Sequence, residues 1–213
     1  MRAMTEGLGD RATAAPAGTA TALLHRIRDH LRTDHVTFGE LLDHLGERAP
    51  GFLLVLLSIP AIVPTPGVPA GLVFGTVLAL VSLQMIAGQQ ALYVPGWLSR
   101  RRVSSGVVHG MLVRAVPVMD RIERWLAPRY AALTRPAMLR PLGFLVLVMG
   151  VLIALPIPFG NTVPGIAVLV IALGLIMRDG LAVAAGVALS LLAVAVSAGL
   201  IAAGYWMVVT ATA

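Results

Sequence analysis

The sequence predicts an all-α integral membrane protein with two repeated, proline-broken helical hairpins, a long C-terminal transmembrane helix and amphipathic surface helices. Three observations predict this fold. The 213 residues are 58% hydrophobic and only 12% charged, with a mean hydropathy of +0.88, whereas a soluble domain carries about 25% charged residues. The apolar residues fall into long runs, and two of these runs are interrupted by proline and glycine in a similar way.

The N-terminal region is predicted to contain a tail and two amphipathic helices. Residues 1–19 are rich in small residues and lack the apolar segment of a signal peptide, so we expect a disordered tail. Amphipathic cytoplasmic helices are expected in 20–48. Within it, 20–32 places leucine and isoleucine on one helical face. A second helix should start at Thr37, because Thr37 and Glu40 have the spacing of a capping box.

Two membrane regions follow. In membrane repeat 1, residues 49–98, a 13-residue apolar run from Gly51 precedes a PTPG break and 21 further apolar residues. Membrane repeat 2, residues 141–209, has a similar broken hairpin and then a transmembrane helix over 181–209. A full span needs about 20 residues, so both 13-residue first arms are short. The arginine-rich stretch 99–140 is expected to connect the repeats as one or two cytoplasmic helices.

The two hairpins resemble each other in sequence. Gly-Phe-Leu at 51–53 recurs at 143–145, and the prolines of the breaks recur in the same order. These predicted structural helix breaks are Pro64, Pro66 and Pro69 in the first half and Pro156, Pro158 and Pro164 in the second. Continued past the breaks, the alignment places Gln84 opposite Asp179. Matched breaks in two apolar halves predict an internal repeat with a binding site at its interface.

The breaks have two interpretations. They are either tight turns at the far membrane surface, where proline is ordinary, or the tips of re-entrant hairpins near the bilayer midplane. Non-helical backbone at that depth is tolerated only where protein or a cavity shields it. The short first arms favour the buried tips.

Five polar residues are candidates for binding a substrate or an ion. They are Thr65, Gln84, Asn161, Arg178 and Asp179. Asn161 or Thr162 either caps the helix that follows or helps to place its positive end toward a bound anion. Arg178 and Asp179 form either a solvated turn, with Gly180 in the left-handed conformation, or a charged pair inside the bundle.

The formal charge of +6 is concentrated beside apolar segments. Nine arginines lie in 100–140 and several more in 26–48, which is typical of cytoplasmic loops that meet anionic headgroups. We expect membrane lipids, and no nucleic acid, as partners. The candidates for headgroup or phosphate contact are Arg121, Glu123, Arg124 and Arg129. Alternatively, these four residues form a solvated face.

No catalytic or metal motif is present in the sequence. Cysteine is absent, and the five histidines do not have the spacing of metal ligands. There is no P-loop, GxSxG or dinucleotide fingerprint. We therefore expect no enzyme activity, no metal and no cofactor.

Five ordered motifs resemble the ExoD family of exopolysaccharide-synthesis membrane proteins: SIPAIVPTPGVP, LQMIAGQQ with PGWLSRR, RIERWLAPRY, LPIPFGNTVPG and LGLIMRDGL. The resemblance implies a bacterial inner-membrane protein of exopolysaccharide synthesis and supplies no reaction. Two functions are expected. The chain is either a transporter-like or lipid-linked-substrate-handling protein with a central site at the breaks, or a non-catalytic accessory subunit of a synthesis or export complex. Synthesis or export proteins and a second copy of the chain are further expected partners.

Overall fold

The computed structural model describes residues 35–62, 70–89, 96–100, 102–104, 110, 117, 121–122, 124–155 and 160–212. The chain divides into two compact units, residues 1–44 with 97–125 and residues 45–96 with 126–213. We call the second unit the helical body. Several predicted features lie outside the described residues: the tail, the helix at 20–32, Thr65, Glu123 and the prolines Pro64, Pro66, Pro69, Pro156 and Pro158.

The first unit contains a short β-ribbon and a capped helix. Strand β1 (His35–Thr37) pairs antiparallel with β2 (Arg102–Ser104), and α2 (Phe38–Leu45) follows β1 directly. The predicted capping box is confirmed, because Thr37 N donates to Glu40 Oε2 at 2.9 Å and Glu40 N donates to Thr37 Oγ1 at 3.3 Å. The bond from the Thr37 backbone lowers the pKa of Glu40. The carboxylate is therefore ionised at neutral pH, and the cap is lost only as the pH falls through that lowered value.

Of the described residues in the 99–140 stretch, 110, 117 and 121–122 are helical, as expected for the one or two helices predicted there, whereas other described parts are not. Strand β2 follows the short helix α5 (Gly96–Ser99), and residues 126–130 are not helical. Two 3-10 turns follow, η2 (Ala131–Thr134) and η3 (Pro136–Met138). No local sequence pattern predicts strand β2, because its partner β1 is distant in the sequence.

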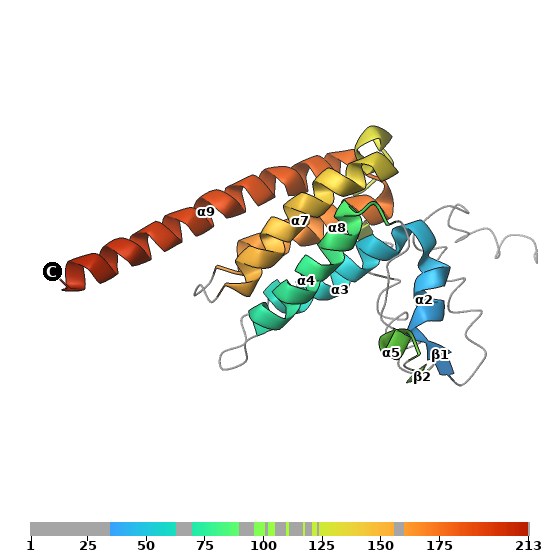
Figure 1. Cartoon of the computed structure of the whole chain (residues 1–213). Coiled ribbons are helices and arrows are strands. Elements are labelled where there is room, and N and C mark those ends of the chain that lie inside the picture. Colours follow the sequence, from blue (N-terminus) through green and yellow to red (C-terminus); the bar gives the residue numbers. More distant parts are fainter. Residues whose placement is uncertain are drawn as a thin grey trace, which may run out of the picture. The chain divides into compact units, whose positions relative to one another are not determined.

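The described residues of the helical body form four short α-helices and one long α-helix, which Figure 1 shows side by side. They are α3 (Ala49–Ile62), α4 (Ala70–Ile86), α7 (Leu139–Ala154), α8 (Thr162–Met177) and α9 (Gly180–Thr212). At 1.5 Å per residue, the short helices are about 21–26 Å long and α9 is about 50 Å long. The prediction of an all-α architecture is confirmed for the helical body, whereas the β-ribbon of the first unit was not predicted.

Glycines determine how closely the four short helices pack. Helix α3 lies antiparallel to α8, and α4 lies antiparallel to α7. A Cβ added to Gly51 of α3 would lie 2.8 Å from Ile176 Cγ1 of α8. A Cβ added to Gly75 of α4 would lie 2.6 Å from both Ala154 N and Gly150 O of α7. The backbones therefore approach as closely as they do in membrane helix pairs with small residues at the interface.

Two described helical stretches are long and apolar enough to cross a membrane, Pro136–Ala154 with 19 residues and Gly180–Thr210 with 31. Only 33% of the most apolar 18-residue window of each is buried in the structure. Large apolar side chains on other helices also point outward, since Leu72 and Leu80 of α4 are each 56% exposed. Exposed apolar surface of this extent is consistent with a membrane protein.

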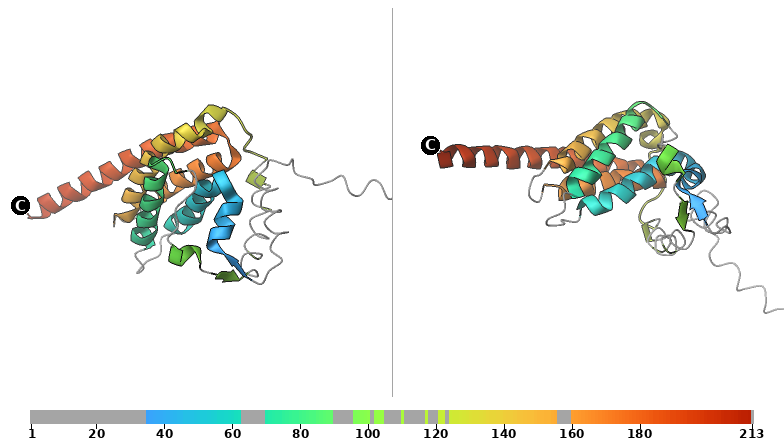
Figure 2. Two further views of the ribbon diagram at one scale, coloured as in Figure 1. Left: turned by 45° about the vertical axis from the view of Figure 1, so that its right-hand side comes forward. Right: turned by 60° about the horizontal axis from the view of Figure 1, so that its bottom comes forward.

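Helix α9 extends beyond the other helices of the helical body (Figure 2). Its first part packs against α7 and α8. The buried residues of that part that recur at helical spacing are Val183, Gly186, Ser190, Ala193 and Ser197. From Ala198 to Thr210 every side chain is exposed. We call this segment the distal half of α9.

Candidate functional site

Helix α8 separates the predicted site residues into two places. Asn161 directly precedes α8, whereas Arg178 and Asp179 follow its last residue, about 24 Å away along the 16-residue helix. Gln84 lies within α4, close to the end of that helix where Arg140 of α7 packs against Gly88. Among the described residues, Gln84, Arg178 and Asp179 are therefore not brought to Asn161. The predicted correspondence of Gln84 with Asp179 is also absent, because Gln84 lies inside α4 whereas Asp179 lies after the end of α8.

Four helix ends meet at Asn161. We call this meeting point the tip cluster, and its members are Ile62 of α3, Gly71 of α4, Ile153 of α7, Asn161, and Gly165 of α8. A Cβ added to Gly71 would collide with Asn161 Nδ2 and would lie 2.7 Å from Ile153 O. A Cβ added to Gly165 would lie 2.7 Å from Ile62 Cγ1. Both predicted helix breaks therefore begin and end at this cluster.

The side chain of Asn161 does not cap α8. Asn161 occupies the N-cap position, but its backbone is helical (φ −80, ψ −23) and its side chain makes no capping hydrogen bond. Its backbone carbonyl accepts the N–H of Gly165 at 2.9 Å. Asn161 Oδ1 is a buried side-chain oxygen with no hydrogen-bond partner in the structure. Such unpaired buried groups are rare and costly, by about 1–3 kcal/mol, so this oxygen marks a candidate binding site.

Pro164, one of the predicted helix breaks, lies in the first turn of α8 and is buried. A proline at this place removes no helical hydrogen bond, because the first N–H groups of a helix have no partner within it. This proline is therefore compatible with α8 and does not itself interrupt the helix.

Asp179 is a buried structural residue at the start of α9. It is only 2% exposed. Its Oδ1 accepts the N–H groups of Leu181 at 2.9 Å and Ala182 at 3.3 Å, and its Oδ2 accepts the N–H of Ala127 at 3.1 Å. The carboxyl group thus caps α9 and ties residues 126–130 to the turn between α8 and α9. Asp179 is neither solvated nor located at the helix breaks.

The left-handed residue of this turn is Arg178, with φ 54, and the prediction that Gly180 takes that role is wrong. A glycine is needed at 180 for another reason. A Cβ there would collide with the carbonyl oxygen of Tyr130, and the N–H of Gly180 donates to Arg129 O at 2.7 Å. Tyr130 is itself left-handed, with φ 48. Sequence reasoning missed this contact because it joins segments distant in the chain.

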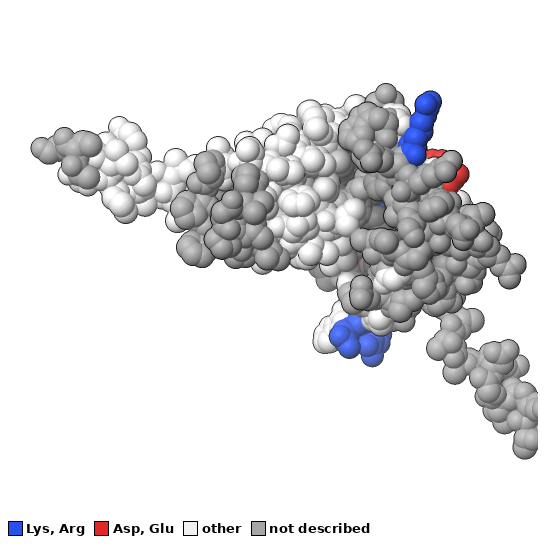
Figure 3. Space-filling view, turned by 90° about the horizontal axis from the view of Figure 1, so that it is seen from below, with Lys and Arg blue, Asp and Glu red and all other residues white. Residues whose placement is uncertain are grey.

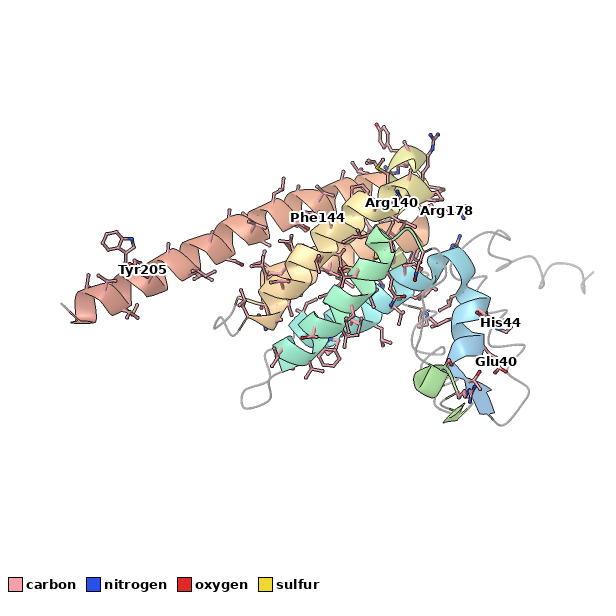
Figure 4. All side chains as sticks on the ribbon, in the orientation of Figure 1. Glu40, His44, Arg140, Phe144, Arg178 and Tyr205 are labelled. Atoms are coloured by element: carbon pink, nitrogen blue, oxygen red, sulfur yellow. The ribbon has the colours of Figure 1, made fainter. Side chains whose placement is uncertain are left out.

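The described arginines of the helical body lie at the end opposite the tip cluster. They are Arg48, Arg129, Arg135, Arg140 and Arg178. Figure 4 shows Arg140 and Arg178 at this end and Tyr205 near the far end of α9. The guanidinium of Arg140 lies against Gly88, where a Cβ would be 3.0 Å from Arg140 Nε. A cation is favourable there, because the carbonyl end of α4 carries partial negative charge. We call this region the arginine end.

The headgroup candidates belong to both units. Arg121 and Arg124 are exposed in the first unit, next to Trp125, which is 79% exposed. Arg129 is exposed in the helical body, next to Tyr130, which is 72% exposed. Arginine with an exposed aromatic ring on each unit is a combination that suits the membrane interface.

Known proteins share most of this chain. The family described as "Exopolysaccharide synthesis, ExoD" matches residues 20–199. The chain is 34% identical over 164 residues to Protein ExoD of Rhizobium meliloti (strain 1021), an alignment that covers 73% of this chain and 66%, just under two thirds, of that protein. It is 29% identical over 158 residues to an uncharacterized protein of Synechocystis sp., with 74% of each chain covered.

No solved structure matches the chain. The family match spans both hairpins, the tip cluster and the capped start of α9. This chain belongs to the ExoD family, whose members are described by their role in exopolysaccharide synthesis.

Proposed function

We propose that this ExoD-family protein is a multi-pass inner-membrane protein that handles a transported or lipid-linked substrate of exopolysaccharide synthesis at the tip cluster. The observation that carries the proposal is the buried, unpartnered Oδ1 of Asn161 where four helix ends meet. The first N–H groups of α4 and α8 and the last carbonyls of α3 and α7 have no partner within their own helices. Broken helices that offer both kinds of end form the binding sites of many transporters. We propose binding without catalysis.

The register between α8 and α9 supports a site deep in the membrane. In their antiparallel packing, Gly174 of α8 faces Val183 of α9. Ile171, three residues earlier in α8, faces Gly186, three residues later in α9. One residue back along α8 therefore corresponds to about one residue forward along α9, as expected for two helices of equal rise.

This register relates the tip cluster to the centre of α9. Thr162 lies nine residues before Ile171, and Ala195 lies nine residues after Gly186, so the start of α8 is about level with Ala195. The apolar run 181–209 is centred on the same residue. When α9 crosses the membrane with this run centred, the tip cluster lies near the midplane. This supports re-entrant hairpins over turns at the surface.

The corresponding places of the two hairpins support the proposed repeat. Gly51 of α3 packs against Ile176 of α8, and Gly143 of α7 packs against Met85 of α4. Each of these glycines lies near the start of the first arm of its hairpin, α3 or α7. Each contacts the second arm of the other hairpin, α8 or α4. Both hairpins have their breaks at the tip cluster and their open ends at the arginine end. We therefore propose a parallel repeat, with its axis along the membrane normal.

Asn161→Ala should abolish exopolysaccharide production without lowering stability. The Oδ1 atom accepts no hydrogen bond in the structure, so its removal leaves no donor unpaired and avoids the cost of burying it. The measurements are exopolysaccharide yield in a strain that depends on this protein and the thermal unfolding midpoint (Tm) of the purified protein. A wild-type yield would refute the central site, and a strongly lowered Tm would assign Asn161 a structural role.

Thr76→Ala is the matched control for Asn161→Ala. Thr76 is an exposed polar residue of α4, and its hydroxyl donates to Leu72 O of the same helix at 2.6 Å. This substitution also removes a polar side chain from an apolar helix, but away from the tip cluster, and should leave production unchanged. Substrate flux by the purified protein in liposomes, lost in Asn161→Ala, would support handling of the substrate by this chain alone. If neither variant shows flux and the protein copurifies with a synthesis enzyme, the results would support the accessory-subunit function instead.

The arginine end should face the cytoplasm. Arginine-rich flanks are retained on that side, and the distal half of α9 carries no charge. In this cysteine-free chain, a cysteine at Ala132 should be shielded from an impermeant thiol reagent applied to intact cells. A cysteine at Thr210, near the other end of α9, should react. The reverse labelling pattern would invert the proposed orientation.

A further inference from the structure

The charge that residues 126–213 expose is basic and lies at one end of the helical body. This part of the chain contains four arginines and one acidic residue. The acidic residue, Asp179, is 2% exposed and accepts three backbone N–H groups, so it leaves no carboxylate at the surface. On the face that Figure 3 shows, the arm of α9 and the surface beside it are white, without blue or red. The arginines are all exposed and belong to the arginine end: Arg129, Arg135, Arg140 and Arg178.

Helix α7 begins at this end with a guanidinium group followed by an aromatic ring. Arg140 and Phe144 are both exposed. They are four residues apart, so they lie on the same face of α7, with Phe144 about 6 Å further along the axis. Figure 4 shows Arg140 at the arginine end and Phe144 further along the helix. This helix belongs to a stretch that is long and apolar enough to cross a membrane.

The order of these two side chains favours a lipid over an acidic protein as the partner of the arginine end. A cation followed by an apolar side chain along one helix face has the same order as the phosphate and the acyl chains of a lipid. An acidic protein surface matches the guanidinium group but not the apolar ring one turn further on. Charge and apolar surface together therefore fit an anionic amphiphile.

Hydrogen bonds place Arg129 beside Arg178. Ala127 N donates to Asp179 Oδ2 at 3.1 Å, and Gly180 N donates to Arg129 O at 2.7 Å. The bond lengths along this path place the Cα atoms of the two arginines at most about 11 Å apart. Two arginine side chains at this separation can contact one phosphate group. The fold thus brings together two exposed guanidinium groups that are distant in the sequence.

Two residues of this region keep a backbone conformation that favours glycine. Tyr130 (φ 48) and Arg178 (φ 54) are the non-glycine residues with positive φ in the described part of the chain, and this conformation is unfavourable for a residue with a Cβ. Neither side chain offsets the cost by packing in the core, because Tyr130 is 72% exposed and Arg178 is exposed as well. Such strain is concentrated at binding sites, which points to a partner outside the helical body.

We infer that the arginine end binds the phosphate group of an anionic membrane lipid. The residues that form this basic surface are Arg129, Tyr130, Arg135, Arg140 and Arg178. Guanidinium groups bind phosphate oxygens through charge-assisted hydrogen bonds, and an exposed tyrosine ring suits the level of the headgroups. The inference rests on the membrane location proposed above, but not on the central site, which lies at the other end of α7 and α8.

Lipid-dependent stabilisation tests the basic surface. The full chain is purified in a non-ionic detergent, and its Tm is measured alone, with phosphatidylglycerol, with phosphatidylcholine of the same acyl chains, and with inorganic phosphate. Phosphatidylglycerol is anionic and phosphatidylcholine has no net charge, so their difference reports recognition of headgroup charge. We expect phosphatidylglycerol to raise the Tm by several degrees, because a ligand that binds the folded state stabilises it. Phosphatidylcholine and inorganic phosphate should give much smaller shifts.

Two double variants locate the effect. Arg129→Gln with Arg135→Gln removes two charges from the basic surface, and Arg100→Gln with Arg124→Gln removes two exposed charges from the first unit. Each variant is compared with its own Tm without lipid, so a change in stability alone does not alter the result. The first pair should lose most of the phosphatidylglycerol shift, and the second pair should keep it.

Four results would overturn the inference. They are an equal shift with phosphatidylcholine, no shift with either lipid, an equal shift with inorganic phosphate, and loss of the shift in both double variants. The third result would assign the surface to a soluble phosphate group, and the fourth would show attraction by total charge. If no lipid shifts the Tm and an acidic protein copurifies with wild type but not with the first pair, the surface binds a protein. Asn161→Ala should keep the full shift, so the central site and the basic surface are tested independently.

Discussion

Gly75→Ala should destabilise the helical body. The added Cβ would lie 2.6 Å from Ala154 N and from Gly150 O. Both are backbone atoms of α7, and they cannot move away unless α4 and α7 separate. Overpacking of this kind costs about 1–3 kcal/mol, and a protein of this size loses roughly 2–4 °C of Tm per kcal/mol. Tryptophan fluorescence during thermal unfolding in detergent should show a Tm several degrees below wild type.

Gly204→Ala is the matched control, because it makes the same change in α9 where nothing lies within 4 Å. Alanine is favoured over glycine in a helix by about 1 kcal/mol, so this variant should keep or raise the Tm. Equal Tm values for Gly75→Ala and Gly204→Ala would contradict the close backbone packing of α4 on α7.

Asp179→Ala should cause the second large loss of stability. It leaves the N–H groups of Ala127, Leu181 and Ala182 without their acceptor. Each buried donor left unpaired costs about 1–3 kcal/mol. The tie to residues 126–130 is lost with the carboxyl group, so trypsin should cleave after the exposed Arg129 faster than in wild type. The measurements are the Tm and the rate of that cleavage.

Asp179→Asn distinguishes a structural role of the Asp179 carboxyl group from a role in binding or conducting an ion. The amide keeps one acceptor for the N–H groups of Leu181 and Ala182 and turns a donor toward Ala127, so the loss of stability should be smaller than in Asp179→Ala. Exopolysaccharide production should then follow the amount of folded protein. A stable Asp179→Asn protein without any production would contradict the structural assignment and restore a functional role for this carboxyl group.

The helices of the body were predictable from hydropathy. The second arm of the second hairpin, predicted to follow the break, is helix α8, Thr162–Met177. The run 181–209 lies within α9. Prediction succeeds here because a helix satisfies its backbone hydrogen bonds within one segment, so its position can be read from one long apolar run. The capping box at Thr37 and Glu40 was equally local, since both bonds lie within four residues.

The role of Asp179 was not predictable, although the sequence singled the residue out. Arg-Asp-Gly between two apolar runs is a turn by composition. That Gly180 faces the Tyr130 carbonyl and that Asp179 accepts the N–H of Ala127 depend on a segment some 50 residues earlier in the chain. The same applies to the β-ribbon, because the two strands are distant in the sequence and each is only three residues long.

The sequence by itself therefore determined the all-α class of the helical body, the positions of its long apolar helices and its family. Only the tertiary structure decided that Asn161, and not Asp179 or Gln84, lies where the helix ends meet. The physical reason is that α3 pairs with α8 and α4 with α7 through glycine faces. Apolar faces attract without direction and carry no pattern that selects a partner. The partner is selected by which backbones can approach closely, and that depends on all the helices together.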